Sequence, residues 1–247
     1  MTPVFLNKMK VQIFIPCFID QLYPSVGFNM VKILEKAGCE IIYPADQTCC
    51  GQPAFNAGFW DDAKSVCRKF IKDFEKDIPV VMPSASCAGF IRNNYTQLFK
   101  NSALQTEITE LQKRTFEFSE FLLDVLKIKK FDAALEGIAT YHDSCAALRE
   151  CHIKKGPRIL LEHVQGLQLF EMDDVETCCG FGGSFAVKYE AISNAMGEQK
   201  VQHALDTKAQ YLISTDMSCL MHLDGYIQKN KLNIKVMHLA DVLASGW

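Results

Sequence analysis

This 247-residue chain has no excess of one charge and no long apolar run, and both absences exclude whole classes of protein. Its 26 lysines and arginines nearly balance 29 aspartates and glutamates, and no basic run stands out that would neutralise a phosphate backbone. No segment approaches the ~20 apolar residues that span a bilayer, and residues 1–10 contain no apolar stretch of signal-peptide length. We therefore expect a cytoplasmic protein that binds no nucleic acid and has no transmembrane segment.

The sequence also lacks the common fingerprints of redox cofactors. Residues 180–183 are glycine-rich, but nothing else in the chain completes a Rossmann or Walker pattern, and there is no Cys-x-x-Cys-x-x-Cys ferredoxin run. A redox function would therefore require flavin, nicotinamide or ferredoxin-type clusters on other chains.

Cysteine, by contrast, is abundant, with 11 residues in the chain. Cytoplasmic thiols stay mostly reduced, so metal ligation explains this number better than disulfide bonds do. The tripeptide Cys-Cys-Gly occurs twice, each time with one further cysteine roughly thirty to forty residues away on either side, which indicates a duplicated unit. The candidate ligands of a cofactor or metal are Cys17, Cys49, Cys50 and Cys87 in the first half and Cys145, Cys178, Cys179 and Cys219 in the second.

Apolar periodicity predicts strands that alternate with helices, in an order that repeats in the two halves. Strands are expected at residues 10–15, 40–43 and 80–82, and again at 137–141, 167–171 and 211–214. Helices are expected at residues 26–37, 61–74 and 88–99, and again at 157–163, 189–206 and 218–229. Each half closes with a strand that runs into a helix, at 116–122 and 236–242, and a polar helical insertion is expected at 101–115.

This alternation is typical of parallel sheets, so the predicted fold class is α/β with two pseudo-repeated Rossmann-like halves. We expect a first cysteine-rich domain at residues 9–126 and a second at 136–247, with a connection at residues 127–136. Each is long enough for a hydrophobic core of its own.

The predicted strands bring the cysteines of each half together. Cys17 follows the first strand, Cys49 and Cys50 follow the second, and Cys87 follows the third. All four therefore lie at the carboxyl edge of one parallel sheet, where loops from neighbouring strands meet and where such folds bind ligands. The second set repeats this placement.

The chemistry of these cysteines favours an iron–sulfur cluster. Thiolates that share a small volume repel one another unless a cation compensates them, and helices that begin near Cys87 and Cys219 favour the anionic form. Adjacent cysteines chelate a single tetrahedral ion poorly, but they can reach different iron atoms of one cluster. Gly51 and Gly180 would let backbone amides approach the cluster sulfurs. Zinc remains the alternative.

The repeated pattern of Cys, Cys-Cys-Gly and Cys resembles the cysteine-rich CCG domain family, twice and over nearly the whole chain. The likeness is greatest to short members with two such domains and no ferredoxin segment, at residues 142–145, 178–183 and 214–222. The resemblance implies an iron–sulfur electron-transfer subunit of a complex that oxidises L-lactate to pyruvate. The implied partners are the other subunits of this complex, including a ferredoxin-type iron–sulfur protein.

The chain departs from the family pattern in one respect. The family's last motif has two cysteines, whereas Ser84 and Asp216 stand at the first of these positions here. Four ligands per site instead of five suit ordinary [4Fe-4S] clusters, one or two per chain, better than clusters of unusual geometry.

Three further cysteines lie outside the repeated sets. Cys39 and Cys67 fall on faces that are expected to be buried, and we interpret them as small core residues. Cys151 follows Cys145 by six residues and is expected to be a surface thiol, with a ligand or redox role as the alternative.

Polar residues near the cysteines have both structural and ligand interpretations. His142 and His222 are expected to be hydrogen-bonded structural residues, with metal ligation as the alternative. Asp216 is expected to cap the helix that begins near Ser218, with ligation of a harder metal as the alternative, and Ser84 is interpreted in the same way. We assign no catalytic residue.

Two other functions stay open on these observations. The first is a stand-alone iron–sulfur reductase that acts on a thiol, a disulfide or a hydroxy acid at an incompletely ligated iron. The second is a zinc-stabilised scaffold or redox sensor. An open iron site distinguishes the reductase, and a colourless protein distinguishes the zinc scaffold.

Overall fold

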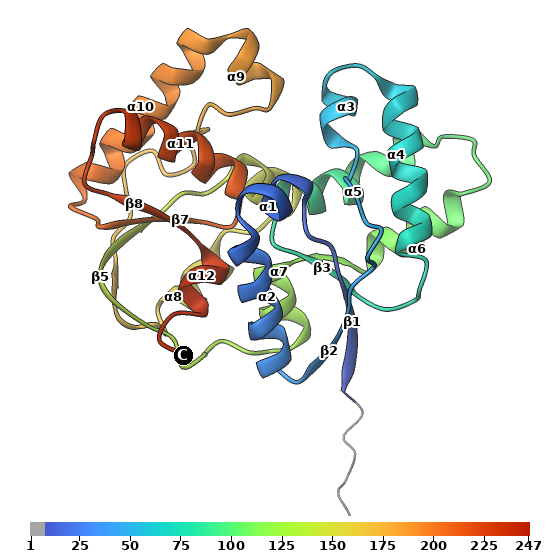
Figure 1. The fold of residues 1–247 in the computed structure, drawn as a ribbon, viewed down its shortest axis with the longest axis horizontal. Helices are drawn as coiled ribbons and strands as arrows, with labels where there is room; N and C mark the ends of the chain where they lie inside the picture. The colour runs from blue at the N-terminus through green and yellow to red at the C-terminus, as the bar shows by residue number, and fades with distance from the viewer. Residues whose placement is uncertain (1–7) are drawn as a thin grey trace, which may run out of the picture.

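The computed structural model describes residues 8–247 and contains two four-stranded sheets with helices around them (Figure 1). The first sheet has the order β2-β1-β3-β4, and the second has the order β6-β5-β7-β8. Every pair of neighbouring strands is parallel. The predicted α/β class with two pseudo-repeated halves is therefore confirmed. The strands are β1 (Met9–Ile13), β2 (Cys39–Ile42), β3 (Val80–Met82), β4 (Thr115–Glu117), β5 (Ala134–Tyr141), β6 (Gln165–Leu169), β7 (Tyr211–Ser214) and β8 (Lys235–His238).

The helices agree with the periodicity of the sequence, apart from several short ones that no periodic pattern announces. Strand β5 also starts earlier than predicted, inside the expected connection. The helices of the first half are α1 (Cys17–Leu22), α2 (Pro24–Lys36), α3 (Gln52–Asn56), α4 (Trp60–Asp73), α5 (Ala85–Leu98), α6 (Gln105–Lys113), α7 (Phe118–Glu120) and the π-helical turn η1 (Phe121–Val125). Those of the second half are the π-helical turn η2 (Ala146–Glu150), α8 (Lys155–Leu161), α9 (Ser184–Lys188), α10 (Glu190–Asp206), α11 (Met217–Lys229) and α12 (Leu239–Leu243).

Helix α2 illustrates how the sequence sets the helix ends. It begins with Pro24, whose fixed φ and missing N–H suit the first helical turn. It stops before Gly38, which has a φ of +86° and ends the helix in the left-handed region. Between these ends, Met30, Ile33 and Leu34 are buried on one face.

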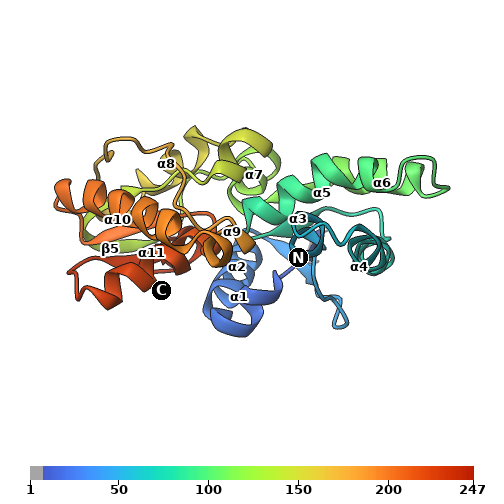
Figure 2. The same ribbon diagram turned by 90° about the horizontal axis from the view of Figure 1, so that it is seen from above.

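The two halves pack together through reciprocal contacts. Helix α2 of the first half packs against α12 of the second, and α7 of the first half packs against α8 of the second (Figure 1). Since α2 corresponds to α8 and α7 to α12, the junction is self-complementary in the manner of a two-fold interface. Viewed from above, α5 and α7 lie on one side of the molecule and α1 and α2 on the other (Figure 2).

The hydrophobic core extends across this junction. One cluster of buried side chains contains Val11 and Leu34 from the first half together with Leu212 and Leu243 from the second. A smaller cluster in the first half also takes in side chains of η2 and the residues that follow it. The expectation of a separate core for each half is therefore wrong, because the helices at the junction bury their apolar faces against the opposite half.

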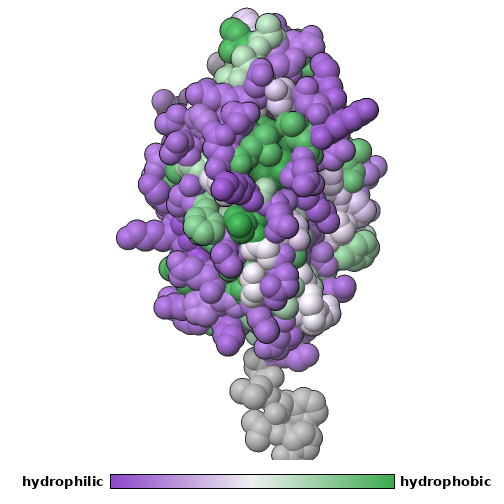
Figure 3. Space-filling model, turned by 90° about the vertical axis from the view of Figure 1, so that its left-hand side faces the viewer, coloured by the Kyte–Doolittle hydropathy of each residue, from purple (hydrophilic) through white to green (hydrophobic). Residues whose placement is uncertain are grey.

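Two features of the structure concern contact with a membrane, namely the length and apolar character of the helices and the polarity of the surface. Among residues 8–247, no helix combines the length and apolar character that crossing a bilayer needs. Hydrophilic side chains cover most of the second-half face seen in Figure 3, and apolar side chains gather there in separate patches.

Candidate metal centres

The first cysteine set lies at the carboxyl edge of the first sheet. Cys17 begins α1 directly after β1, Cys49 and Cys50 lie in the loop after β2, and Cys87 is the third residue of α5, after β3. In the strand order β2-β1-β3-β4, the chain changes direction between β1 and β3, and such a switch point opens a crevice at the carboxyl ends of the strands. The structure therefore brings the four predicted residues to one place.

Two short sulfur–sulfur contacts join the thiols of this set. Cys17 Sγ lies 3.9 Å from Cys49 Sγ, and Cys50 Sγ lies 3.4 Å from Cys87 Sγ. The hydrogen bond from the Cys17 thiol is the largest of the effects that lower the pKa of Cys49 to about 3. The same bond raises the pKa of Cys17, which keeps its proton. The lowered pKa favours the thiolate form of Cys49, with the Cys17 thiol as its hydrogen-bond donor.

The loop that carries the first Cys-Cys-Gly is fixed by hydrogen bonds. The backbone N–H of Gly51 donates to Cys49 Sγ at 3.4 Å. The carbonyl of Cys50 accepts from the hydroxyl of Tyr95 at 2.7 Å and from the thiol of Cys67 at 3.5 Å. Cys67 is fully buried, and burial raises its pKa to about 11, as expected of a core thiol.

The second set repeats this arrangement. Cys145 immediately precedes η2, Cys178 and Cys179 lie in the loop between β6 and α9, and Cys219 is the third residue of α11. Hydrogen bonds, first from the thiol of Cys145, lower the pKa of Cys178 to about 2. The N–H of Gly180 donates to Cys178 Sγ at 3.4 Å. The second thiolate therefore stands at the position equivalent to the first.

The imidazole of His142 lies within the second set and has no hydrogen-bond partner among residues 8–247. His142 follows β5 directly, its side chain is fully buried, and both ring nitrogens lack a partner among the described residues. A ring nitrogen and the sulfurs of Cys179 and Cys219 all lie within 4.8 Å of one another. Burial, aided by the charge of Lys200, lowers the pKa of His142 to about 3, so its imidazole is neutral. The expectation of a hydrogen-bonded structural histidine is wrong here.

The other histidine near this set has the structural role that the sequence predicts. Nε2 of His222 lies 3.3 Å from both the hydroxyl and the carbonyl oxygen of Ser193. The hydroxyl of Ser193 donates in turn to the carbonyl of Gly180 at 2.8 Å. His222 thus supports the Cys-Cys-Gly loop through Ser193.

The remaining cysteines are all buried. Cys39 lies in the core at the start of β2, as expected. Cys151 was expected at the surface, but its thiol is buried and donates to the carbonyl of Ala85 at 3.4 Å. Burial raises the pKa of Cys151 to about 12. The prediction fails because η2 packs against α5 of the first half, which a sequence pattern within one half does not reveal.

The two positions that lack the family's fifth cysteine meet at the junction. Ser84 and Asp216 form an antiparallel β-bridge with each other. Ser84 caps α5 as predicted, since its hydroxyl accepts from the N–H of Cys87 at 3.4 Å. Asp216 does not cap its own helix. Its Oδ2 accepts from the N–H of Ser86 at 2.9 Å, because the two halves bring the start of α5 within its reach.

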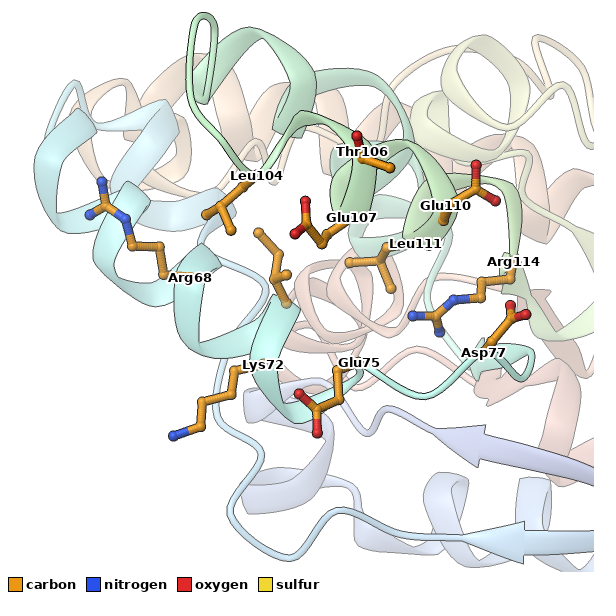
Figure 4. Close-up of a pocket in the computed structure, with 11 residues that line it drawn as sticks. Arg68, Lys72, Glu75, Asp77, Leu104, Thr106, Glu107, Glu110, Leu111 and Arg114 are labelled. Carbon is orange, nitrogen blue, oxygen red and sulfur yellow. The ribbon is translucent and has the colours of Figure 1, made fainter.

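A pocket outside the cysteine sets lies between α4 and α6 (Figure 4). Neither a thiol nor an imidazole lines it, so it does not extend either cysteine site. Its charged lining residues are Arg68, Lys72, Glu75, Asp77, Glu107, Glu110 and Arg114.

Two α/β halves with four clustered cysteines each define a tandem cysteine-rich protein with sites suited to a metal or an iron–sulfur group. A family model described as a cysteine-rich domain, CCG, matches residues 11–92 and 139–224. The chain therefore belongs to the CCG cysteine-rich domain family, as the spacing of the cysteines indicates.

Curated relatives match this chain over nearly its full length. Lactate utilization protein A of Halalkalibacterium halodurans is 45% identical over 236 residues, which cover 95% of this chain and 96% of that protein. Lactate utilization protein A 2 of Bacillus cereus (strain Q1) is 41% identical over 239 residues, which cover 96% of this chain and 99% of that protein. Both names agree with the branch of the family that the motifs resemble.

A solved structure shares the fold. A hypothetical protein from Helicobacter pylori superposes with a TM-score of 0.57 and 11% identity over 96% of this chain. The chain spans about half of that protein, 49%, and the likeness concerns the fold alone.

Proposed function

We propose that this chain is an iron–sulfur electron-transfer subunit of a complex that oxidises L-lactate to pyruvate. The observation that carries the proposal is the convergence of two matching sets of four cysteines at the carboxyl edges of the two sheets. The printed names of the relatives support lactate as the substrate of the whole system.

In the first set, the spread of the thiols supports a cluster over a single zinc ion. Zinc bonds of about 2.3 Å in a tetrahedron hold the sulfurs about 3.8 Å apart, so four zinc ligands form a compact group. In the first set the sulfurs form close pairs, but within residues 8–247 no three of its ligand atoms all lie within 4.8 Å of one another. A group with several irons suits such a spread, because each cysteine then binds a different iron.

The residues around the thiols prepare each site for an anionic group. The thiolates of Cys49 and Cys178 are the first ligands available, and the N–H groups of Gly51 and Gly180 donate to them. The first turns of α5 and α11 direct their positive ends toward the cysteines. A cluster held here would accept and release single electrons.

The polar residues of the site support a relay role over stand-alone turnover. Oxidation of a 2-hydroxy acid needs a base and a two-electron acceptor beside the substrate. His142 is completely buried, and His222 is engaged by Ser193, so neither imidazole faces an open substrate site. Substrate chemistry therefore belongs to a partner subunit in this proposal, and one partner carries ferredoxin-type clusters.

Metal analysis of anaerobically purified protein tests the cofactor. We expect a brown protein with on the order of eight irons per chain, if each half holds a four-iron cluster. Electron paramagnetic resonance of the reduced protein should show cluster signals. Stoichiometric zinc without iron after anaerobic reconstitution contradicts the proposal.

Cysteine variants test which residues hold the clusters. Cys50→Ser and Cys179→Ser should each lose about half of the iron, because each removes one ligand from one set. Cys39→Ala is the matched control, since this buried cysteine lies outside both sets and should keep the iron content of the wild type. Equal iron loss in all three variants means that the ligands are misassigned.

An assay with L-lactate tests the subunit role. The reconstituted chain should form no pyruvate with an artificial one-electron acceptor, and activity should require partner subunits. Sustained pyruvate formation by the chain alone would instead identify a stand-alone enzyme.

A further inference from the structure

The two halves differ in kind at three equivalent positions around their cysteines. The first half has phenylalanine at each of these positions, and the second half has an ionisable side chain. The equivalent pairs are Phe14 and His142, Phe70 and Lys200, and Phe90 and His222.

Sequence position and local geometry establish this equivalence. The members of the first pair lie three residues before the first cysteine of their set, and the members of the third pair lie three residues after the last. Phe70 lies seven residues after Ala63, and Lys200 lies seven residues after Ser193. The carbonyl oxygens of Ala63 and Ser193 are equivalent, because each lies close to the glycine of the Cys-Cys-Gly in its own half. The sequence duplication therefore holds, while the chemistry around the sulfurs has diverged.

In the first half these positions form ordinary apolar core. The rings of Phe14 and Phe70 pack edge to face, with centroids 4.9 Å apart, and both side chains are buried. Among residues 8–247, no histidine, aspartate or glutamate forms a compact group of ligand atoms with the cysteines of the first set.

In the second half the same positions place two polar groups in the interior. Lys200 is only 1% exposed. Its Nζ donates to the carbonyl oxygens of Asp174 and Val175, at 2.5 and 3.2 Å. His142 is 0% exposed, and neither of its nitrogens has a partner among residues 8–247. A buried polar group without a partner costs folding free energy, so it needs an explanation.

A bound metal explains the unpartnered imidazole. His142 has a ring nitrogen within 4.8 Å of the sulfurs of Cys179 and Cys219, and nitrogen and sulfur donors at such spacing can bind the same metal group. We propose that His142 is a nitrogen ligand of the group held by the second cysteine set. The two halves then hold groups with different ligands, thiolates alone in the first and thiolates with imidazole in the second. This inference rests on the proposed function only in requiring that the second set binds metal.

The buried lysine has a consequence for redox potential. The cation of Lys200 interacts with the charges of Cys178 and Cys179 and raises the reduction potential of the group that they hold, because a positive charge favours the reduced, more negative state. The second centre should therefore accept electrons at a higher potential than the first.

Pulsed electron paramagnetic resonance on protein with ¹⁵N-labelled histidine tests the ligand directly. The full chain with Cys50→Ser isolates the second set and needs no change at His142. We expect a directly bonded ¹⁵N coupling in its reduced centre. Its absence from a loaded centre overturns the proposal.

Two variants identify the histidine. His142→Phe introduces the residue of the first half and should abolish the coupling. His222→Phe makes the same exchange at the third equivalent position and should keep it, since His222 is hydrogen-bonded to Ser193. A coupling that survives His142→Phe contradicts the assignment.

Cobalt(II) separates this inference from the iron–sulfur proposal. If iron does not assemble but cobalt binds the second set, with ligand-field bands that shift in His142→Phe, the cluster proposal fails and the ligand assignment stands. If neither metal binds the second set, or cobalt gives identical spectra in wild type and variant, the ligand assignment is wrong.

Discussion

The glycine of each Cys-Cys-Gly meets two requirements at once. Gly180 has a φ of +94°, and a Cβ built on it would lie 2.5 Å from the carbonyl oxygen of Ser193. Any larger residue would therefore strain the backbone and push the loop away from α10. The same glycine directs its N–H to Cys178, so the tight turn and the electrostatics of the sulfur depend on one residue.

We expect Gly180→Ala to reduce the free energy of unfolding by roughly 3 kcal/mol, from backbone strain and the clash with Ser193 together. Gly38→Ala is the matched control, because Gly38 has a similar φ of +86° but open space around it. It should cost only about 1 kcal/mol. Urea unfolding measures both values, and equal losses would show that the close approach to Ser193 does not matter.

A buried carboxyl makes stability depend on pH. Burial raises the pKa of Glu117 from 4.5 to about 7, although Ser119 and the backbone of Glu120 donate to it. Its protonated form therefore favours the fold. This stability is complete below pH 4.5 and is lost as the pH rises through about 7.

Glu117→Gln should remove this dependence, because the amide keeps an acceptor for the N–H of Ser119 and does not ionise. Relative to wild type, we expect the variant to gain about 2–3 kcal/mol of stability between pH 5 and pH 8. Urea unfolding of both proteins at the two pH values measures the difference. A constant difference across this range contradicts the shifted pKa.

Sequence reasoning located the cysteines because the spacing of parallel strands decides where such residues meet. It could not identify His142 as unusual, since the absence of a hydrogen-bond partner depends on side chains distant in the sequence. The exchange of Phe14 for His142 was nevertheless visible in the aligned halves. A comparison of residues around the repeated motifs, beyond the motifs themselves, would have found it.

At the scale of elements, the long helices and the strands follow from periodicity, whereas the short helices next to the cysteines do not. Helices α1, α3 and α9 have five or six residues each, too few for an apolar repeat. They form because the chain must turn at the sheet edge.

Helix α8 carries an arginine that pairs with two carboxylates at the ends of strands of the second sheet. Arg158 makes two hydrogen bonds of 2.9 Å to Asp143 and also pairs with Glu171. The carboxylate of Asp143 is buried and lies next to His142, so Arg158 also positions the segment that leads to Cys145.

Arg158→Met should destabilise the protein by about 3 kcal/mol, because it leaves Asp143 buried without its counter-charge. Lys154→Met removes a neighbouring pair with Glu176 that is exposed to solvent, and it should leave stability nearly unchanged. Thermal unfolding of both variants compares the buried ion pair of Arg158 with the exposed ion pair made by the residue that precedes α8. Similar losses would indicate that Arg158 contributes by packing alone.

At the scale of the whole molecule, the duplication visible in the sequence predicts the topology of each half. It does not predict that each half folds as a separate unit. The strand orders of the two halves are identical, yet the larger hydrophobic cluster draws on both. Domain boundaries inferred from a repeat assume that each copy buries its own apolar face. Here α2 and α12, and likewise α7 and α8, cover each other instead.

Separation of the halves should therefore prevent folding. Residues 1–126 and 127–247, expressed apart so that β5 stays intact, expose the apolar faces of these helices, including Leu34 in one fragment and Leu243 in the other. We expect each fragment alone to bind hydrophobic dyes and to unfold without cooperativity, and a mixture of the two to recover a cooperative transition. The helix contacts at the junction are reciprocal, so we expect each half to need the other in order to fold. A cooperative transition of residues 127–247 alone, with the stability of the intact chain, would show that the junction is an interface between independent domains.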